Sequence, residues 1–376
     1  METKIFSDSD KAMLSIKMAV AAVDNTSKLL KKYGRITPKL PITLPHTLFY
    51  GPGGTGKTKR VEEAVKLMGC SEEAGTFIRV SPDCLKKNGI EGFIDILNKN
   101  LSWEGYLCNH GKTSHCNCPS HNHKIVDTES PRAPVKQIAV FLDEIHVVPA
   151  DIQEKLGLIL LDFKYQTITP LGLKTYYFPK FTLFAATTLP GDLIKPLRTR
   201  FGNKFSVSYY TDTEMVSIAS VMAKQRGWNV AAESLELLAK ASQGIARECE
   251  NHLTGLFNCW IYLMSTGQEV NKHVITKEVT LQYLSIKQFT EDGLSFDQVK
   301  ILKYLASFAK DGKVKGVGVN RVCGALGLDA QRFSDELEPR LSAKNFISSG
   351  GRGREITNEG MQYLEVTLTK YPELSE

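Results

Sequence analysis

The stretch His46–Gly69, HTLFYGPGGTGKTKRVEEAVKLMG, decides the fold of this chain. It opens with a short apolar strand, Leu48 to Tyr50, which leads into the loop Gly51–Thr58, of the form G-x-x-x-x-G-K-T. A helix is predicted after the loop, because apolar residues recur on one face: Val61, Ala64, Val65 and Met68. Such a loop directs backbone N–H groups at a phosphate, and the positive end of the helix adds to the attraction. The stretch therefore predicts a phosphate-binding loop in an α/β domain.

The same loop predicts the ligands of ATP and Mg²⁺. Lys57 is expected to reach the β- and γ-phosphates, and the Thr58 hydroxyl to hold Mg²⁺. The other residues expected to line the nucleotide are Gly51, Gly53, Gly54, Thr55 and Gly56. The alternative is a flexible glycine-rich turn, which the strand–loop–helix context disfavours.

A second apolar strand, Ile138 to Leu142, ends in Asp143 and Glu144. A continuous apolar run is typical of a buried parallel strand, and α/β folds bind ligands at the carboxyl ends of such strands. Asp143 is expected to hold the Mg²⁺ shell and Glu144 to orient the attacking water. An acidic pair after a strand is by itself more often a solvated loop, but the phosphate loop favours catalysis. His146 is interpreted as a structural or supporting residue.

A third apolar strand, Phe181 to Thr188, ends in two threonines. We expect Thr188, rather than Thr187, to hydrogen-bond the γ-phosphate or the attacking water. Threonine is common at strand ends, so a purely structural role is the alternative.

About ten residues later the stretch PLRTRFG places Arg198 and Arg200 one residue apart. Charge develops on the γ-phosphate oxygens during phosphoryl transfer, and an arginine there raises the rate by about 10³–10⁵. Because Lys57 already serves the chain's own nucleotide, the pair is expected to complete the site of a neighbouring subunit. The alternative is a salt-bridged surface pair.

The order of these motifs resembles that of the AAA+ ATPases. The strings FLDEIH, FTLFAATT, PLRTRFG and GIARECENHL are most similar to those of the RuvB family of Holliday-junction branch-migration motors, over roughly residues 45–364. The resemblance implies that Arg200 is an arginine finger and Arg198 a supporting cation. It also implies that Tyr210 contacts the nucleotide and that Arg247 is the sensor arginine of a helical lid.

Three parts are predicted along the chain. A large AAA+ P-loop domain, with a parallel sheet between helices, covers residues 1–205 and carries an insert at about 102–135. A small helical lid domain covers 206–289, with Arg247 near the first turn of a helix. A winged-helix DNA-binding domain covers 290–370, because three helical stretches precede a glycine-rich hairpin.

The hairpin of that last domain carries Arg352 and Arg354 with no acid between them. Both are expected to contact DNA phosphates, and the alternative is a turn whose arginines serve solubility. The RuvB family usually has another basic residue earlier in the wing, where this chain has Ser348 and Ser349.

The insert, which contains LCNHGKTSHCNCPSHNHK, is rich in cysteine and histidine and lacks an apolar core of its own. Zn²⁺ is the predicted ion. Its ligands are expected from among Cys108, Cys116, Cys118, His110, His115, His121 and His123. A disordered polar loop is the alternative, since the Cys-x-Cys spacing is not that of a standard finger. The RuvB family lacks this insert.

Composition sets wider limits. The 376 residues predict two or three domains, and 42% hydrophobic with 23% charged residues is typical of a folded soluble protein. A net charge of +6 permits a nucleic-acid partner without requiring one. No apolar run is long enough to span a bilayer, and the first residues lack the apolar core of a signal peptide. A cytoplasmic protein with reduced or metal-bound cysteines is therefore expected.

Together these features predict an ATPase that drives DNA as a motor of RuvB type, promoting branch migration of Holliday junctions in recombination and repair as a hexameric ring. The alternative is an AAA+ winged-helix replication initiator or loader that switches on ATP without translocating. The family has a hairpin that docks on the junction-binding partner RuvA. The corresponding stretch here, YQTITPLGLKTYYFPK, looks short, which speaks against a RuvA-like partner.

Overall fold

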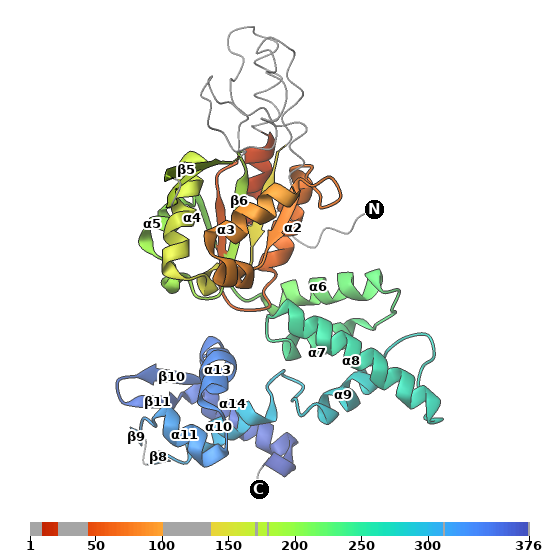
Figure 1. Ribbon diagram of the computed structural model, residues 1–376. Helices are drawn as coiled ribbons and strands as arrows, with labels where there is room; N and C mark the ends of the chain where they lie inside the picture. The colour runs from red at the N-terminus through yellow and green to blue at the C-terminus, as the bar shows by residue number, and fades with distance from the viewer. Residues whose placement is uncertain are drawn as a thin grey trace. The chain divides into compact units, whose positions relative to one another are not determined.

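The computed structural model describes residues 10–21, 44–100, 137–169, 172–178, 180–310 and 313–374. The chain divides into two compact units, Met1–Ser208 and Tyr209–Glu376 (Figure 1). No helix among the described residues is long and apolar enough to cross a membrane.

The first unit is built on a parallel five-stranded sheet in the order β2-β3-β6-β1-β7. In that order the strands are Phe77–Val80, Ala139–Leu142, Thr182–Thr187, Thr47–Tyr50 and Asn203–Ser206. The three strands predicted from apolar runs, β1, β3 and β6, are confirmed to within one residue at each end. Because they are parallel neighbours, their carboxyl ends meet at one edge of the sheet. The phosphate loop, the acidic pair and the two threonines therefore converge there.

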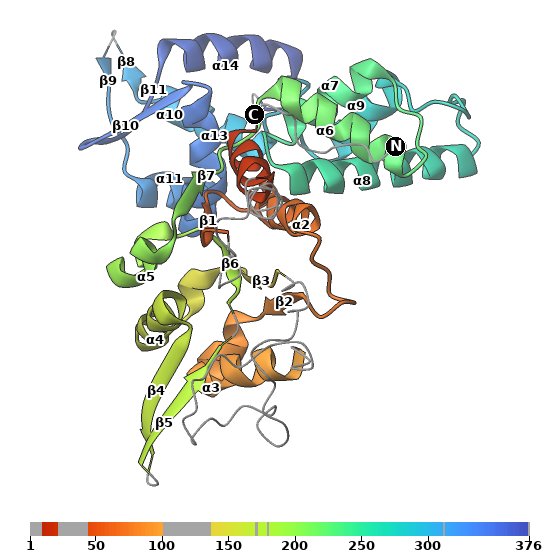
Figure 2. The same cartoon turned by 90° about the horizontal axis from the view of Figure 1, so that it is seen from above.

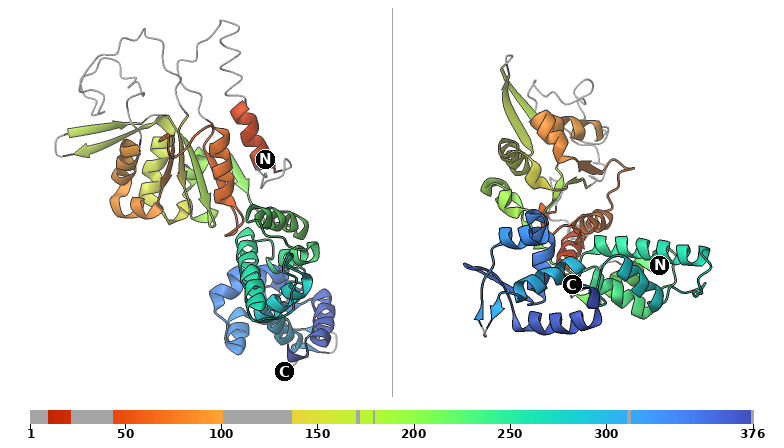
Figure 3. Two further views of the ribbon diagram at one scale, coloured as in Figure 1. Left: turned by 90° about the vertical axis from the view of Figure 1, so that its right-hand side faces the viewer. Right: turned by 90° about the horizontal axis from the view of Figure 1, so that it is seen from below.

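Helices cover both faces of this sheet, which confirms the predicted α/β class (Figure 3). Successive strand residues point to opposite faces. Phe49, Phe141 and Phe184 accordingly pack with α2 (Lys57–Leu67) and the helical residues 11–21. The alternate strand positions pack with α3 (Pro82–Asn100) and α4 (Ala150–Asp162) on the other face. Each core cluster is thus fixed by strand periodicity.

A hairpin follows α4 and leads back to the sheet (Figure 2). Its strands β4 (Lys164–Thr169) and β5 (Gly172–Tyr177) have six residues each and pair along their whole length. Whether this hairpin is shorter than the one in the family, and whether it meets a RuvA-like partner, stay predictions. Ile168, near that tip, is 86% exposed.

The second unit begins with the four helices of the predicted lid. They are α6 (Asp212–Gln225), α7 (Ala232–Ala241), α8 (Ala246–Ser265) and α9 (Lys277–Ile286). The first is capped reciprocally by the Thr211 and Glu214 side chains, a capping box that stabilises its N-terminus. Their apolar faces form one buried cluster.

The winged helix follows, as predicted. Its helices are α10 (Phe296–Ala306), α11 (Val319–Leu326) and a third built from α12 (Ala330–Arg332), the π-turn η5 (Phe333–Leu337) and α13 (Glu338–Ala343). The wing is the antiparallel pair β10 (Ile347–Gly350) and β11 (Gly353–Ile356). Four elements were not predicted: β8 (Ala309–Lys310), β9 (Lys313–Val314), the long helix α14 (Asn358–Lys370) and the 3₁₀ turn η6 (Pro372–Leu374).

Candidate nucleotide site and DNA-binding wing

The phosphate loop starts at a position held by its neighbours on both sides. The Gly51 N–H donates to the Thr187 carbonyl at 3.2 Å, and the Val207 N–H donates to the Tyr50 carbonyl at 2.8 Å. Gly51 has φ of 144°, and a Cβ there would lie 2.0 Å from the Val207 oxygen. No other residue fits this turn, so the loop requires glycine at its first position.

The interior of the loop is suited to an anion. The Lys57 ammonium donates to the Gly51 and Pro52 carbonyls at 2.8 Å each, and the residue is 6% exposed. Helix α2 begins at Lys57 after Gly56, whose φ is 82°, with no side-chain cap. The N–H groups of its first turn are therefore not used by a capping side chain, and they can bind the phosphates of a nucleotide.

Thr58 and Asp143, predicted as Mg²⁺ ligands from positions far apart in sequence, lie together. The Thr58 hydroxyl donates to Asp143 Oδ2 at 3.0 Å, and Asp143 Oδ1 accepts the Glu144 N–H at 3.0 Å. A hydroxyl and a carboxylate are hard oxygen ligands of the kind Mg²⁺ prefers. The residues present therefore fit this ion.

Glu144 lies at the end of β3 in the left-handed region, with φ of 45° and ψ of 49°. Its Oε2 accepts the backbone N–H and the hydroxyl of Thr188 at 3.0 and 3.1 Å. A residue other than glycine in this conformation carries about 1–3 kcal/mol of backbone strain, and strained residues cluster at functional sites. The structure thus brings together the two residues that the sequence proposed for handling water.

His146 and Thr187 form a pair that sequence reasoning did not find. His146 Nδ1 lies 3.0 Å from the Thr187 hydroxyl and 3.2 Å from Glu144 Oε2. Thr187 is fully buried and accepts the Leu189 N–H. The sequence did contain a signal for this pair. Neighbouring residues of a strand point to opposite faces, so Thr187 and Thr188 cannot have the same partners. His146 therefore contacts the same Glu144 carboxylate oxygen that accepts the Thr188 hydrogen bonds.

Arg60 is a second residue that the sequence did not single out. Its Nη1 donates to the Thr55 carbonyl at 3.0 Å and to the Gly56 carbonyl at 3.4 Å. Its Nε donates to Asp10, whose carboxylate also caps the helical residues 11–21. Arg60 therefore joins the phosphate loop to the first described helix, and only the packing of that helix on α2 reveals it.

The two predicted finger arginines end α5 (Lys195–Arg200). Arg198 is exposed, whereas Arg200 is half-buried. The Arg200 Nε is buried and has no hydrogen-bond partner among the residues that the structure describes. Because this atom has almost no accessible surface, the unpaired Nε does not by itself mark a contact with another molecule. Its action on a neighbour stays a prediction.

Arg247 and Tyr210 belong to the second unit. Arg247 is exposed on the first turn of α8, as predicted. The Tyr210 N–H donates to the Gly244 carbonyl at 3.0 Å, so both residues adjoin the same turn. Their nucleotide contacts depend on the arrangement of the two units and stay predictions.

The two wing arginines differ. Arg352 is exposed at the tip. Arg354 Nε and Nη2 donate to the two carboxylate oxygens of Glu338 at 2.8 and 2.9 Å, and these hydrogen bonds raise the pKa of Arg354. Its backbone also pairs with Val317. Arg354 therefore holds the wing against α13, which leaves Arg352 as the available phosphate contact.

All seven predicted zinc ligands lie outside the described residues. Across the ranges that are described, no group of three or more His, Cys, Asp or Glu side chains could hold a metal ion. Zinc stays a prediction.

The sheet order, the phosphate loop and the acidic strand end define a P-loop ATPase with a C-terminal winged helix. Two family models match: "Holliday junction DNA helicase RuvB P-loop domain" at residues 133–207 and "RuvB C-terminal winged helix domain" at 291–365. The chain belongs to the RuvB family, as the sequence relatives also show.

Among these relatives, the Holliday junction branch migration complex subunit RuvB of Mycoplasmopsis pulmonis is 33% identical over 235 residues, covering 60% of this chain and 70% of that protein. The subunit of the same name from Nitratiruptor is 28% identical over 343 residues, covering 90% and 87%. The solved Thermotoga maritima RuvB branch migration motor is similar in fold, with a TM-score of 0.61, 22% identity and 94% coverage of both chains.

Proposed function

We propose that this chain is an ATP-driven motor that promotes branch migration of Holliday junctions, acting in DNA recombination and repair. The observation that carries the proposal is the set Thr58, Asp143, Glu144 and Thr188, joined by hydrogen bonds at the carboxyl ends of adjacent strands in a chain of the RuvB family. The comparisons do not favour the alternative of a replication initiator or loader.

In this proposal the strand ends carry out hydrolysis. Lys57 and the first turn of α2 hold the phosphates, and Thr58 with Asp143 would hold Mg²⁺, which neutralises charge on the phosphate oxygens. Glu144 orients the attacking water, and Thr188 with His146 sets the direction of its carboxylate. Arg200 of one subunit completes the site of the next in a ring, which we propose to be hexameric.

A motor must also transmit the state of the nucleotide to DNA. Gln243, next to the turn that leads to Arg247, exchanges side-chain hydrogen bonds with Gln298 of α10 at 2.7 and 3.3 Å. Gln298 is 1% exposed and also donates to the Leu337 carbonyl. The sensor turn and the winged helix are thus joined by the half-buried amide of Gln243 and the buried amide of Gln298, which supports movement of the two together.

The deciding experiment is branch migration on a synthetic four-way junction, with and without ATP. We expect ATP-dependent conversion of the junction to duplex products, and no conversion by Glu144→Gln protein. ATP hydrolysis and junction binding without conversion would instead support a switch that does not translocate. Because β4 and β5 pair over six residues each, the assay should include a RuvA-like protein. If the exposed Ile168 lies on its docking surface, Ile168→Asp removes only the stimulation by that protein.

The wing gives a prediction with an internal control. Arg352→Ala should lower the salt slope of DNA binding by about 1, as expected for one lost phosphate contact, without changing the melting temperature. Arg354→Ala should instead destabilise the fold, because it leaves the Glu338 carboxylate, only 12% exposed, without its partner. The expected loss is about 1–2 kcal/mol, between the values for surface and for buried ion pairs. Salt titrations and thermal melts separate the two. An unchanged slope in Arg352→Ala would place the DNA contact elsewhere.

We retain zinc binding by the Cys/His-rich insert as a proposal on composition alone. Elemental analysis of untagged protein should find about one zinc per chain, as for a four-ligand site. Replacing Cys116 and Cys118 by serine should remove it while ATP hydrolysis persists, because the phosphate loop and the catalytic strand ends lie outside the insert. Metal-free wild-type protein would end this proposal.

A further inference from the structure

Gln153 is a buried glutamine of α4 that lies outside the set of residues around the phosphate loop. It is 2% exposed, and both ends of its amide are used. Nε2 donates to the Val148 carbonyl at 2.9 Å and approaches the Asp192 carbonyl at 3.5 Å, while Oε1 accepts the Ile194 N–H at 3.0 Å. One side chain therefore joins the segment after the acidic pair to the segment that enters α5.

On the first side the path from Gln153 to Glu144 is short. Val148 follows the 3₁₀ turn η3 (Ile145–Val147), which begins directly after Glu144. The Val147 N–H donates to the Glu144 carbonyl at 3.0 Å, and the Val148 N–H to the Ile145 carbonyl at 3.2 Å. A single hydrogen-bonded turn thus separates the Gln153 amide from the backbone of the catalytic glutamate.

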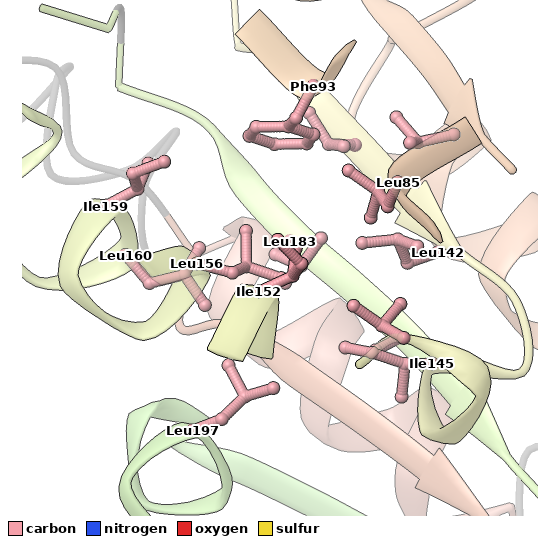
Figure 4. Packing of buried hydrophobic residues seen from close by; sticks show 14 of the residues in the cluster. Leu85, Phe93, Leu142, Ile145, Ile152, Leu156, Ile159, Leu160, Leu183 and Leu197 are labelled. Carbon is pink, nitrogen blue, oxygen red and sulfur yellow. The ribbon is translucent and has the colours of Figure 1, made fainter. Parts of the chain in front are cut away.

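On the second side Gln153 holds the residue that starts the arginine helix. Ile194 is the N-cap of α5, and its carbonyl accepts the Arg198 N–H at 3.0 Å. With six residues and no side-chain cap, α5 is too short to be stable alone, so tertiary contacts set its direction. Leu197 supplies the apolar contact, extending from α5 toward Ile152 of α4 (Figure 4). Gln153 supplies the polar contact.

The connection between β6 and α5 is held at both of its ends. At the start, Thr188 hydrogen-bonds the Glu144 carboxylate. Then the Asp192 N–H donates to the Leu189 carbonyl at 3.2 Å, and Ile194 reaches Gln153. Hydrogen bonds therefore run from Glu144 to α5 by two routes, one through Thr188 and one through η3, and the routes meet at the Gln153 amide.

We propose that Gln153 is a positioning residue that sets the orientation of Arg200 and couples it to Glu144 of the same subunit. The inference rests on the proposed role of Arg200 as an arginine finger. When the nucleotide changes the contacts of Glu144 and Thr188, the shift passes through Gln153 to α5, and so to the site that Arg200 completes. Each subunit thereby reports the state of its own site to the next.

The test uses Gln153→Met, which keeps the volume of the side chain and removes both hydrogen bonds. Affinity for ATP should stay within about threefold of wild type, because the phosphate loop is untouched. The rate of hydrolysis should fall about 10- to 100-fold, the loss expected when a catalytic group is misplaced by about an ångström. The control is Ile159→Val, a core change on the same helix without a hydrogen bond, which should leave the rate near that of wild type.

A double-mutant cycle separates positioning from general damage. If Gln153 acts through Arg200, the double variant Gln153→Met/Arg200→Ala should hydrolyse ATP as slowly as Arg200→Ala alone. Losses that multiply would overturn the proposal. So would a Gln153→Met protein with a normal rate.

Mixing experiments add a readout that loss of stability cannot imitate. Gln153→Met protein has an intact nucleotide site and a misplaced finger, so mixing it with Lys57→Ala protein should restore hydrolysis, and mixing it with Arg200→Ala protein should not. The mixture of Arg200→Ala with Lys57→Ala is the reference. If that reference fails to recover, the trans finger of the proposed function is wrong, while the double-mutant cycle still tests Gln153.

Gln153→Glu keeps the acceptor for the Ile194 N–H and removes the donor to the Val148 and Asp192 carbonyls, so it serves if the methionine variant does not fold. Protonation of the new carboxyl restores a donor at that position. The rate of this variant, relative to wild type, should therefore rise as the pH is lowered. A ratio that does not change with pH, in folded protein, would contradict the need for the Val148 hydrogen bond.

Discussion

Glu144→Gln should bind ATP normally and lose about 10²–10⁴-fold in the rate of hydrolysis, the range expected for loss of a general base. The substitution keeps the size of the side chain and an oxygen that can accept the Thr188 hydrogen bonds, so the fold and the phosphate loop should be unaffected. It removes the negative charge that orients and deprotonates the attacking water. Single-turnover hydrolysis and equilibrium binding of ATP separate the two effects.

Glu154→Gln is a matched control for this prediction. It makes the same chemical change at an exposed position ten residues away, on α4, and should hydrolyse ATP at the wild-type rate. Normal hydrolysis by Glu144→Gln would show that the end of β3 does not carry the base.

Arg200→Ala should lose about 10³–10⁵-fold in hydrolysis while ATP binding changes little, because an arginine finger stabilises charge that develops only in the transition state. Arg198→Ala, which changes the exposed neighbour, should have a smaller effect.

Action on a neighbouring subunit is tested by mixing Arg200→Ala with Lys57→Ala protein in equal amounts. Random assortment in a closed ring places an intact nucleotide site beside an intact finger at about one interface in four, so hydrolysis should recover to a comparable fraction of wild type. Hydrolysis that stays at the level of the separate variants, with rings present, would contradict a finger supplied in trans.

The phosphate site shows how far local pattern carries. The loop Gly51–Thr58, the acids after β3 and the threonines after β6 were found because each follows an apolar strand, and strand ends meet where a sheet is parallel. The role of Arg60 was not predicted, because its partners Thr55 and Asp10 follow no periodic pattern in the sequence. The interpretation of Arg354 as a DNA contact missed Glu338, sixteen residues away on a different element.

By itself the sequence determined the class of the domain, the phosphate loop, the acidic pair at the end of β3, and the order of lid and winged helix. These depend on strand and helix periodicity and on loop residues, which act over a few neighbours along the chain. The catalytic role of Glu144 stays a prediction. Only the tertiary structure decided that His146 pairs with Thr187, that Arg354 is bound to Glu338, and that Gln153 joins the acidic turn to α5. The physical reason is that a side-chain hydrogen bond exists only within about 3 Å. The packing of the core, rather than proximity in sequence, brings distant residues to that distance.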